Sequence, residues 1–180
     1  MEIDGFIKLL PCKLTEKQKK DLLYSDLISK TITVGARQSG RSTVMYILIM
    51  FNMFKGGNSI LFTNNYQQGE GFITNMAKLY YAMKPFTTLR FQKRSVIGNN
   101  SRLDLCSMNN IDKLRGMTTS YAYIDNADLR RVDDIKEIYY ALKTIPIKIN
   151  VTNDSARLNL IKPYIEDNKF SLTDTNILLG

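Results

Sequence analysis

One short glycine-bearing segment constrains the fold of this chain more than any other. The segment Gly35–Thr43 reads GARQSGRST and fits the pattern G-x-x-x-x-G-[K/R]-[S/T]. It follows the β-branched run 30–34 and precedes the apolar run 41–54, which we expect to form a strand and a helix. Glycines at this spacing let backbone N–H groups converge on a phosphate, and the N-terminus of the helix adds the positive end of its dipole. The pattern therefore predicts a strand, a phosphate-binding loop and a helix in that order.

Side chains of this loop have separate predicted roles. Ser42 occupies the position that ligates Mg²⁺, and Arg41 stands where a lysine normally touches the β- and γ-phosphates. Arginine can hold phosphate bidentately but is bulkier and geometrically fixed, so binding would survive this change more readily than hydrolysis. The residues expected to contact the nucleotide are Gly35, Gln38, Ser39, Gly40, Arg41, Ser42 and Thr43. The alternative is a turn between a strand and a helix that binds nothing.

A second segment supplies a carboxylate. The segment 121–125 reads as an apolar strand that ends in an acid, and Asp125 would hold Mg²⁺ directly or through water. Many motor ATPases have a glutamate next, which orients or deprotonates the attacking water, whereas this chain has Asn126. An amide can position a water molecule but cannot accept its proton, and Asp128 lies close by as a second candidate. Taken alone, Asp125 could equally be a carboxylate in a turn at the end of a strand.

Helix-like and strand-like segments alternate along the chain, which predicts an α/β fold. We expect one domain over residues 1–180, with a mainly parallel sheet flanked by helices, of the P-loop NTPase (ASCE/RecA-like) class. The expected helices are 15–27, 41–54, 71–83, 132–142 and 156–167. The expected strands are 30–34, 59–63, 95–98, 102–106, 121–125 and 147–152.

The composition excludes several kinds of site. The chain has no histidine, which excludes histidine general bases, Ser-His-Asp triads and histidine-ligated metals. Its two cysteines, Cys12 and Cys106, lie far apart and form no CxxC pair, so neither a zinc site nor a disulfide framework is expected. The net charge of +8 favours a polyanionic partner such as DNA, RNA or a nucleotide. The start of the chain carries Glu2 and Asp4 and lacks a signal peptide, and the apolar run 44–54 is too short to span a bilayer.

Taken in order, these segments resemble the ATPase domain of the large terminase subunit of tailed phages, the motor that packages DNA into proheads. The resemblance runs from about residue 14 to residue 155. The segment Leu14–Gln18 is similar to the adenine-recognising segment of that family, with Gln18 as the adenine reader. The segment Arg37–Ser42 is similar to the family's Arg-Gln-x-Gly-Lys-[Ser/Thr] loop, which makes Arg37 the additional arginine that senses or stabilises the γ-phosphate.

Three further segments carry the same resemblance. Leu114–Gly116 resembles the Leu-Arg-Gly stretch before the Walker B strand, and Tyr123–Asp128 resembles the hydrophobic-Asp-Glu-Ala segment. Thr152 and Asn153 fall where the family has a short motif that couples hydrolysis to movement. Each segment also has a simpler interpretation: Gln18 as a solvated helix residue, Arg115-Gly116 as a turn, and Thr152-Asn153 as a strand end followed by a helix cap.

The resemblance implies a Mg²⁺-dependent ATPase of a viral packaging motor. Its implied cofactors are ATP and Mg²⁺. Its implied partners are double-stranded DNA, the portal or other packaging proteins, and further copies of the chain in a ring. The implied location is the cytoplasm of an infected host cell, and no membrane partner is implied. The basic residues Arg90, Lys93 and Arg94 are candidates for nucleic-acid contact, or else form an ordinary solvated face.

The departures from the family pattern leave alternatives open. Arg41 replaces the expected lysine, Asn126 replaces the expected glutamate, and no room remains after Gly180 for a C-terminal nuclease domain. We therefore expect no nuclease activity. We expect the chain to be an isolated ATPase-domain fragment, a small stand-alone relative or a degenerate copy of the large terminase. A hydrolysis-deficient nucleotide-binding, DNA-binding or regulatory module is the main alternative function. A helicase-type or recombinase-type P-loop protein is the other.

Overall fold

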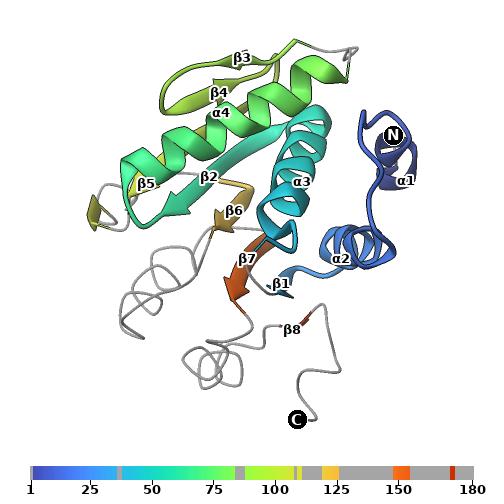
Figure 1. The fold of residues 1–180 in the computed structure, drawn as a ribbon. Coiled ribbons are helices and arrows are strands. Elements are labelled where there is room, and N and C mark those ends of the chain that lie inside the picture. The colour runs from blue at the N-terminus through green and yellow to red at the C-terminus, as the bar shows by residue number, and fades with distance from the viewer. Residues whose placement is uncertain are drawn as a thin grey trace.

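A mixed β-sheet with helices packed against it forms the described part of the chain (Figure 1). The computed structural model describes residues 2–35, 38–83, 88–107, 109–110, 119–125, 148–154 and 171–172. The predicted helices 132–142 and 156–167, the segment Leu114–Gly116, and Arg37, Asn126 and Asp128 lie outside these residues. Within the described ranges no helix is both long and apolar enough to cross a membrane.

Three of the described helices match predicted ones. They are α2 (Glu16–Leu27), α3 (Arg41–Lys55) and α4 (Tyr66–Ala82), and a short α1 (Ile3–Ile7) precedes them. Helix α4 begins five residues earlier than expected, because Asn65 caps it by accepting a hydrogen bond from the Gln68 N–H at 2.9 Å. Helix α1 was not predicted, since five residues are too few to show a helical period.

The sheet is mainly parallel, as predicted. The strands are β1 (Lys30–Gly35), β2 (Gly57–Thr63), β3 (Arg90–Phe91), β4 (Ser95–Ile97), β5 (Ser101–Ser107), β6 (Tyr121–Ile124), β7 (Lys148–Asp154) and β8 (Ser171–Leu172). Their order in the sheet is β3-β4-β5-β2-β6-β7-β1-β8. The neighbours from β5 to β8 in this order pair in parallel, whereas β4 pairs antiparallel with both β3 and β5.

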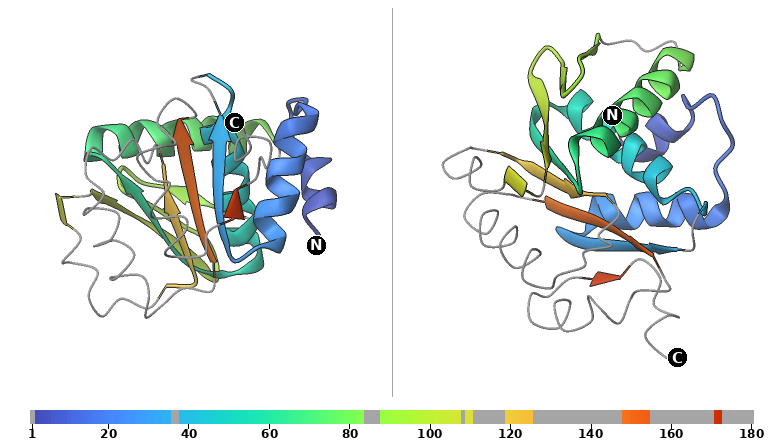
Figure 2. Two further views of the ribbon diagram at one scale, coloured as in Figure 1. Left: turned by 90° about the horizontal axis from the view of Figure 1, so that it is seen from below. Right: turned by 60° about the vertical axis from the view of Figure 1, so that its left-hand side comes forward.

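The glycine-bearing loop and Asp125 come to the same edge of this sheet. Strand β7 lies between β1 and β6, and Figure 2 (left) shows β1 and β7 side by side with the same direction. Gly35 pairs in register with Asp154, and Ile124 pairs with Val151 on the same strand. The loop after β1 and Asp125 after β6 therefore both lie at the carboxyl edge, where parallel α/β sheets bind ligands.

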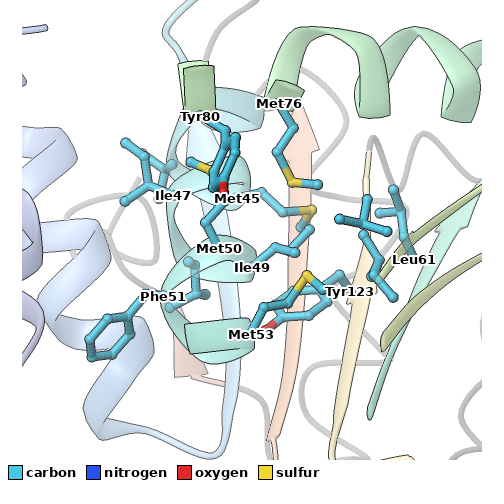
Figure 3. Packing of buried hydrophobic residues seen from close by; sticks show 14 of the residues in the cluster. Met45, Ile47, Ile49, Met50, Phe51, Met53, Leu61, Met76, Tyr80 and Tyr123 are labelled. Atoms are coloured by element: carbon cyan, nitrogen blue, oxygen red, sulfur yellow. The ribbon is translucent and has the colours of Figure 1, made fainter. Parts of the chain in front are cut away.

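Helix α3 is the centre of the hydrophobic core. It is apolar nearly all round, and residues 44–53 are buried apart from the half-buried Tyr46, which confirms the prediction that neighbours cover it on both sides. It packs against the sheet, α2 and α4, and the ring of Phe6 from α1 lies 5.6 Å from that of Phe51. Figure 3 shows the side chains of this helix reaching toward Leu61 and Tyr123 of the sheet. This packing fixes the N-terminal end of α3 beside the end of β1.

Candidate active site

Ser42 and Asp125 meet at the carboxyl edge of the sheet. The Ser42 hydroxyl, in the first turn of α3, donates to Asp125 Oδ1 at 3.1 Å and lies 3.5 Å from Oδ2. Two adjacent oxygen ligands of an octahedral Mg²⁺, each at about 2.1 Å, lie about 3 Å apart. A hydroxyl and a carboxylate at this separation fit one small divalent cation, whose other ligands would be water and phosphate oxygens.

The backbone of the loop is shaped for an anion. Gln38 and Gly40 both adopt left-handed conformations, with φ of 64° and 83°. Alternation of this kind turns successive N–H groups toward one concave side, which is the geometry of anion-binding loops. Gly40 is the N-cap of α3, and because it has no side chain this residue supplies no capping hydrogen bond to the first turn. This is the end of α3 at which the helix dipole favours an anion.

Gln18 lies against this loop. Its Nε2 donates to the Ser39 carbonyl oxygen at 3.3 Å. Its Oε1 accepts from the Thr15 N–H at 2.9 Å, and its own N–H bonds the Thr15 hydroxyl at 3.2 Å, which is the capping box of α2. The structure therefore brings the predicted adenine reader into contact with the predicted phosphate-binding loop, although the two are far apart in sequence.

Gly40 leaves no room for a side chain at this contact. A Cβ on Gly40 would collide with the Gln18 amide nitrogen, and its φ of 83° is disfavoured for other residues. Gly40→Ala is therefore expected to destabilise the fold by about 1–2 kcal/mol and to weaken nucleotide binding. Thermal unfolding and ATP titration measure both effects.

Gly71→Ala is the matched control for this substitution. Gly71 lies in α4 and faces open space where a Cβ would stand, so alanine there should leave binding unchanged and stabilise the helix slightly. Equal behaviour of the two variants would contradict a specific role of Gly40.

Tyr46 is a residue of this site that sequence reasoning missed. It lies four residues after Ser42 on α3, which places both on one face of the helix, and its ring meets Phe72 of α4 edge-on at 4.3 Å. Burial raises the pKa of the Tyr46 hydroxyl, a hydrogen bond with Asn75 opposes the shift, and the negative charge of Asp125 adds to it. The phenol therefore stays protonated at neutral pH. The spacing from Ser42 was the only sequence signal that could have found it.

Other predicted site residues occupy supporting positions. Arg41 and Thr43 flank Ser42 in the first turn of α3, and both are half-buried. Thr152 and Asn153 pair in register with Thr33 and Val34 of β1. The predicted coupling segment thus runs beside the strand that leads into the phosphate loop.

The predicted basic cluster is divided between the two ends of the β3–β4 hairpin. Arg94 Nε donates to Glu70 Oε1 at 3.0 Å, and Lys93 Nζ lies 3.6 Å from Glu70 Oε2. The Arg94 guanidinium also lies 4.1 Å from the centre of the Tyr66 ring, and it holds the pKa of the Glu70 carboxyl below its usual value. The Arg94 carbonyl accepts from the Leu105 N–H, so this turn lies at the carboxyl edge of the sheet.

Arg90 lies toward the opposite end of the hairpin. It pairs with Ile97, which pairs with Arg102 near the start of β5. The structure therefore brings Lys93 and Arg94 together on Glu70 and does not bring Arg90 to them.

Solved structures with a similar fold include phage large-terminase ATPase domains and a phage DNA-packaging ATPase. The ATPase domain of the large terminase of a Thermus phage matches with a TM-score of 0.65 and 19% identity, over 84% of this chain and 68% of that one. The chain has the fold of a large-terminase ATPase domain. No protein-family model and no curated protein sequence matches it.

Two further structures share the large-terminase ATPase fold. The large terminase of a thermophilic bacteriophage, in complex with ATP-γ-S, matches with a TM-score of 0.68 and 12% identity, over 92% of this chain and 46% of that one. The bacteriophage phi29 genome packaging motor assembly matches with a TM-score of 0.60 and 12% identity, over 88% of this chain and 51% of that one. The chain therefore spans only about half of the longer packaging proteins.

Proposed function

We propose that this chain binds Mg²⁺ and ATP at the carboxyl edge of its sheet, hydrolyses the ATP, and serves as the ATPase domain of a viral DNA-packaging motor. The observation that carries this proposal is the contact between Ser42, in the first turn of the helix that follows the glycine-bearing loop, and Asp125, directly after β6, at 3.1 Å. Matching structures of phage packaging ATPases, one of them holding ATP-γ-S, support the same assignment.

The residues present divide the work of phosphoryl transfer. The amides around Gly40 cradle the phosphates, and Arg41 and Arg37 offset the charge on the γ-phosphate. Ser42 and Asp125 would hold the metal ion, which would neutralise negative charge on the phosphates. Gln18 would read the adenine, and its contact with Ser39 of the loop supports this role.

Activation of water is the weakest part of this site. Asn126 can orient a water molecule but cannot remove its proton, so Asp128 or a neighbouring subunit is the candidate for that step. We therefore propose slow hydrolysis for the isolated chain. Thr152 and Asn153, which lie beside the phosphate-loop strand, would pass the change of bound nucleotide to the rest of the motor.

Double-stranded DNA and packaging proteins are the proposed partners. The net charge of +8 favours a polyanion, and Lys93, Arg94 and Arg90 are the proposed DNA contacts. Because Lys93 and Arg94 already pair with Glu70, DNA would have to share or displace that carboxylate. By analogy with packaging motors, we propose that the chain works as a homo-oligomeric ring beside a portal protein, in the infected host cell.

The alternative is a nucleotide-binding or regulatory module of the packaging machinery that does not hydrolyse ATP. Two residues favour it: Arg41 in place of the usual lysine and Asn126 in place of the usual glutamate. Both changes leave the phosphate-binding backbone intact while weakening the chemical step.

Binding and turnover, measured with and without Mg²⁺ and double-stranded DNA, test this proposal and separate the two functions. The motor ATPase predicts Mg²⁺-dependent ATP binding and turnover that DNA stimulates. The regulatory module predicts binding without turnover. A chain that binds neither ATP nor ADP in the presence of Mg²⁺ would contradict both.

A further inference from the structure

We propose that a buried hydrogen bond between Asn52 and Tyr123 fixes the register of α3 against β6 and so keeps Ser42 and Asp125 together. Both residues would then be positioning residues for the magnesium site, which neither would touch. This inference rests on the proposed function, because it assigns these residues to the same metal and nucleotide site.

The bond joins the same two elements that carry the site. Asn52 Nδ2 donates to the Tyr123 hydroxyl oxygen at 2.6 Å. Asn52 lies on the same helix as Ser42, and Tyr123 precedes Asp125 by two residues, a spacing that puts both on one face of the sheet. Helix α3 and the segment of β6 and Asp125 are therefore joined by two polar contacts, one at the sheet edge and one inside the core.

Burying these two polar side chains in the core has a free-energy cost that apolar side chains would not have. Asn52 is 1% exposed and Tyr123 is fully buried, which raises the pKa of the phenol far above its usual range. Within the described residues nothing donates to Asn52 Oδ1. Burial of a polar atom without a partner is unfavourable, whereas leucine and phenylalanine would fill a similar volume without that cost. Net stability alone therefore does not account for the pair.

The Asn52–Tyr123 bond would fix the rotation of α3 relative to the sheet. The side chains packed around α3 include Met45, Met50, Met53 and Met76, all buried, and Figure 3 shows several of them between the helix, α4 and the sheet. Methionine is flexible and adapts to small shifts of its neighbours, so it specifies the rotation of a helix poorly. In coiled coils a single buried asparagine is the best-attested residue for fixing the register of the helices, and Asn52 would do the same between α3 and β6.

The test is the double variant Asn52→Leu with Tyr123→Phe in the full chain. Its ATP dissociation constant is measured with and without Mg²⁺, beside thermal unfolding. We expect a melting temperature at or above that of the unaltered chain, and a loss of about tenfold in the gain of affinity that Mg²⁺ provides. A role in stability alone would give the opposite result, with a lowered melting temperature and an unchanged Mg²⁺ effect.

Tyr80→Phe is the matched control. Tyr80 is also buried, and its hydroxyl accepts from the Leu89 N–H at 2.8 Å near the C-terminal end of α4, away from Ser42. Its removal should lower stability and leave the Mg²⁺ effect unchanged. Tyr123→Phe alone, which keeps the ring and removes only the hydroxyl, is measured in parallel in case the double variant does not fold, and it is expected to lose the Mg²⁺ effect in the same direction.

The outcomes separate this inference from the proposed function. If the unaltered chain binds ATP with a Mg²⁺ effect and the folded variants keep that effect in full, the positioning role is overturned and the proposed function stands. If the unaltered chain binds no nucleotide, the proposed function fails and this inference fails with it.

Discussion

Asp125→Ala is expected to remove Mg²⁺-dependent nucleotide binding and turnover almost completely. The substitution deletes the only carboxylate that the described part of the chain places on the Ser42 hydroxyl. Loss of partners outside the ligand shell already costs about 10- to 100-fold in metal affinity, so loss of a ligand should cost at least about 10²-fold. Titration of ATP with and without Mg²⁺ gives the affinities, and phosphate release gives the turnover.

Asp104→Ala is the control for this loss. Asp104 is an aspartate on β5 whose carboxylate pairs with Arg102 on the surface, at 2.7 Å. Exposed pairs contribute little to stability, so this variant should bind and unfold like the unaltered chain. If Asp125→Ala kept its Mg²⁺ effect while remaining folded, Asp125 would be a structural carboxylate at the end of a strand, and the magnesium site would lie elsewhere.

Asn126→Glu is expected to raise ATP turnover by up to about 10²-fold, the lower end of what a placed general base contributes. A carboxylate at this position can accept the proton of the attacking water, which the native amide cannot. The gain should appear in kcat and leave the affinity for Mg²⁺ and ATP nearly unchanged, since binding uses other groups. Steady-state phosphate release at saturating ATP measures it.

Asn126→Gln separates the charge from the length of the side chain. Glutamine has the reach of glutamate and lacks its basicity, so it should not raise turnover. An equal gain in both variants would show that reach matters and proton acceptance does not. No gain in either would place the catalytic water away from residue 126 and direct attention to Asp128 or a neighbouring subunit.

Local patterns predicted most of the described helices and strands correctly. The β-branched run into Gly35, the apolar run of α3 and the Thr15–Gln18 capping box each carry their own signal, so their elements could be placed from the sequence. The start of α4 was missed, because Gly69 and Gly71 weaken a helical pattern that the Asn65 cap then rescues. The two-residue strand β8 was missed because it exists only through its pairing with β1.

The sequence predicted which residues belong to the candidate site better than it predicted the contacts between them. A motif could name Ser42 and Asp125, but only the strand order brings residues so far apart within 3.1 Å. No pattern could show that Glu70 engages Lys93 and Arg94, because that pairing depends on how the β3–β4 turn meets α4. Tyr46 and the Asn52–Tyr123 bond were missed for the same reason. The role of a polar residue in an apolar helix depends on the side chain that it contacts, and the sequence does not show that contact.

The glycine at the N-cap of α3 has a thermodynamic consequence. Because Gly40 has no side chain to cap the helix, an anion that binds at this end can supply hydrogen bonds of the kind that a capping residue gives other helices. By linkage, any anion that binds the folded chain and not the unfolded one raises the free energy of unfolding as its concentration rises. The melting temperature of this chain should therefore depend on the anions in its solution as well as on its sequence, and a nucleotide that binds as proposed would supply the cap that Gly40 does not.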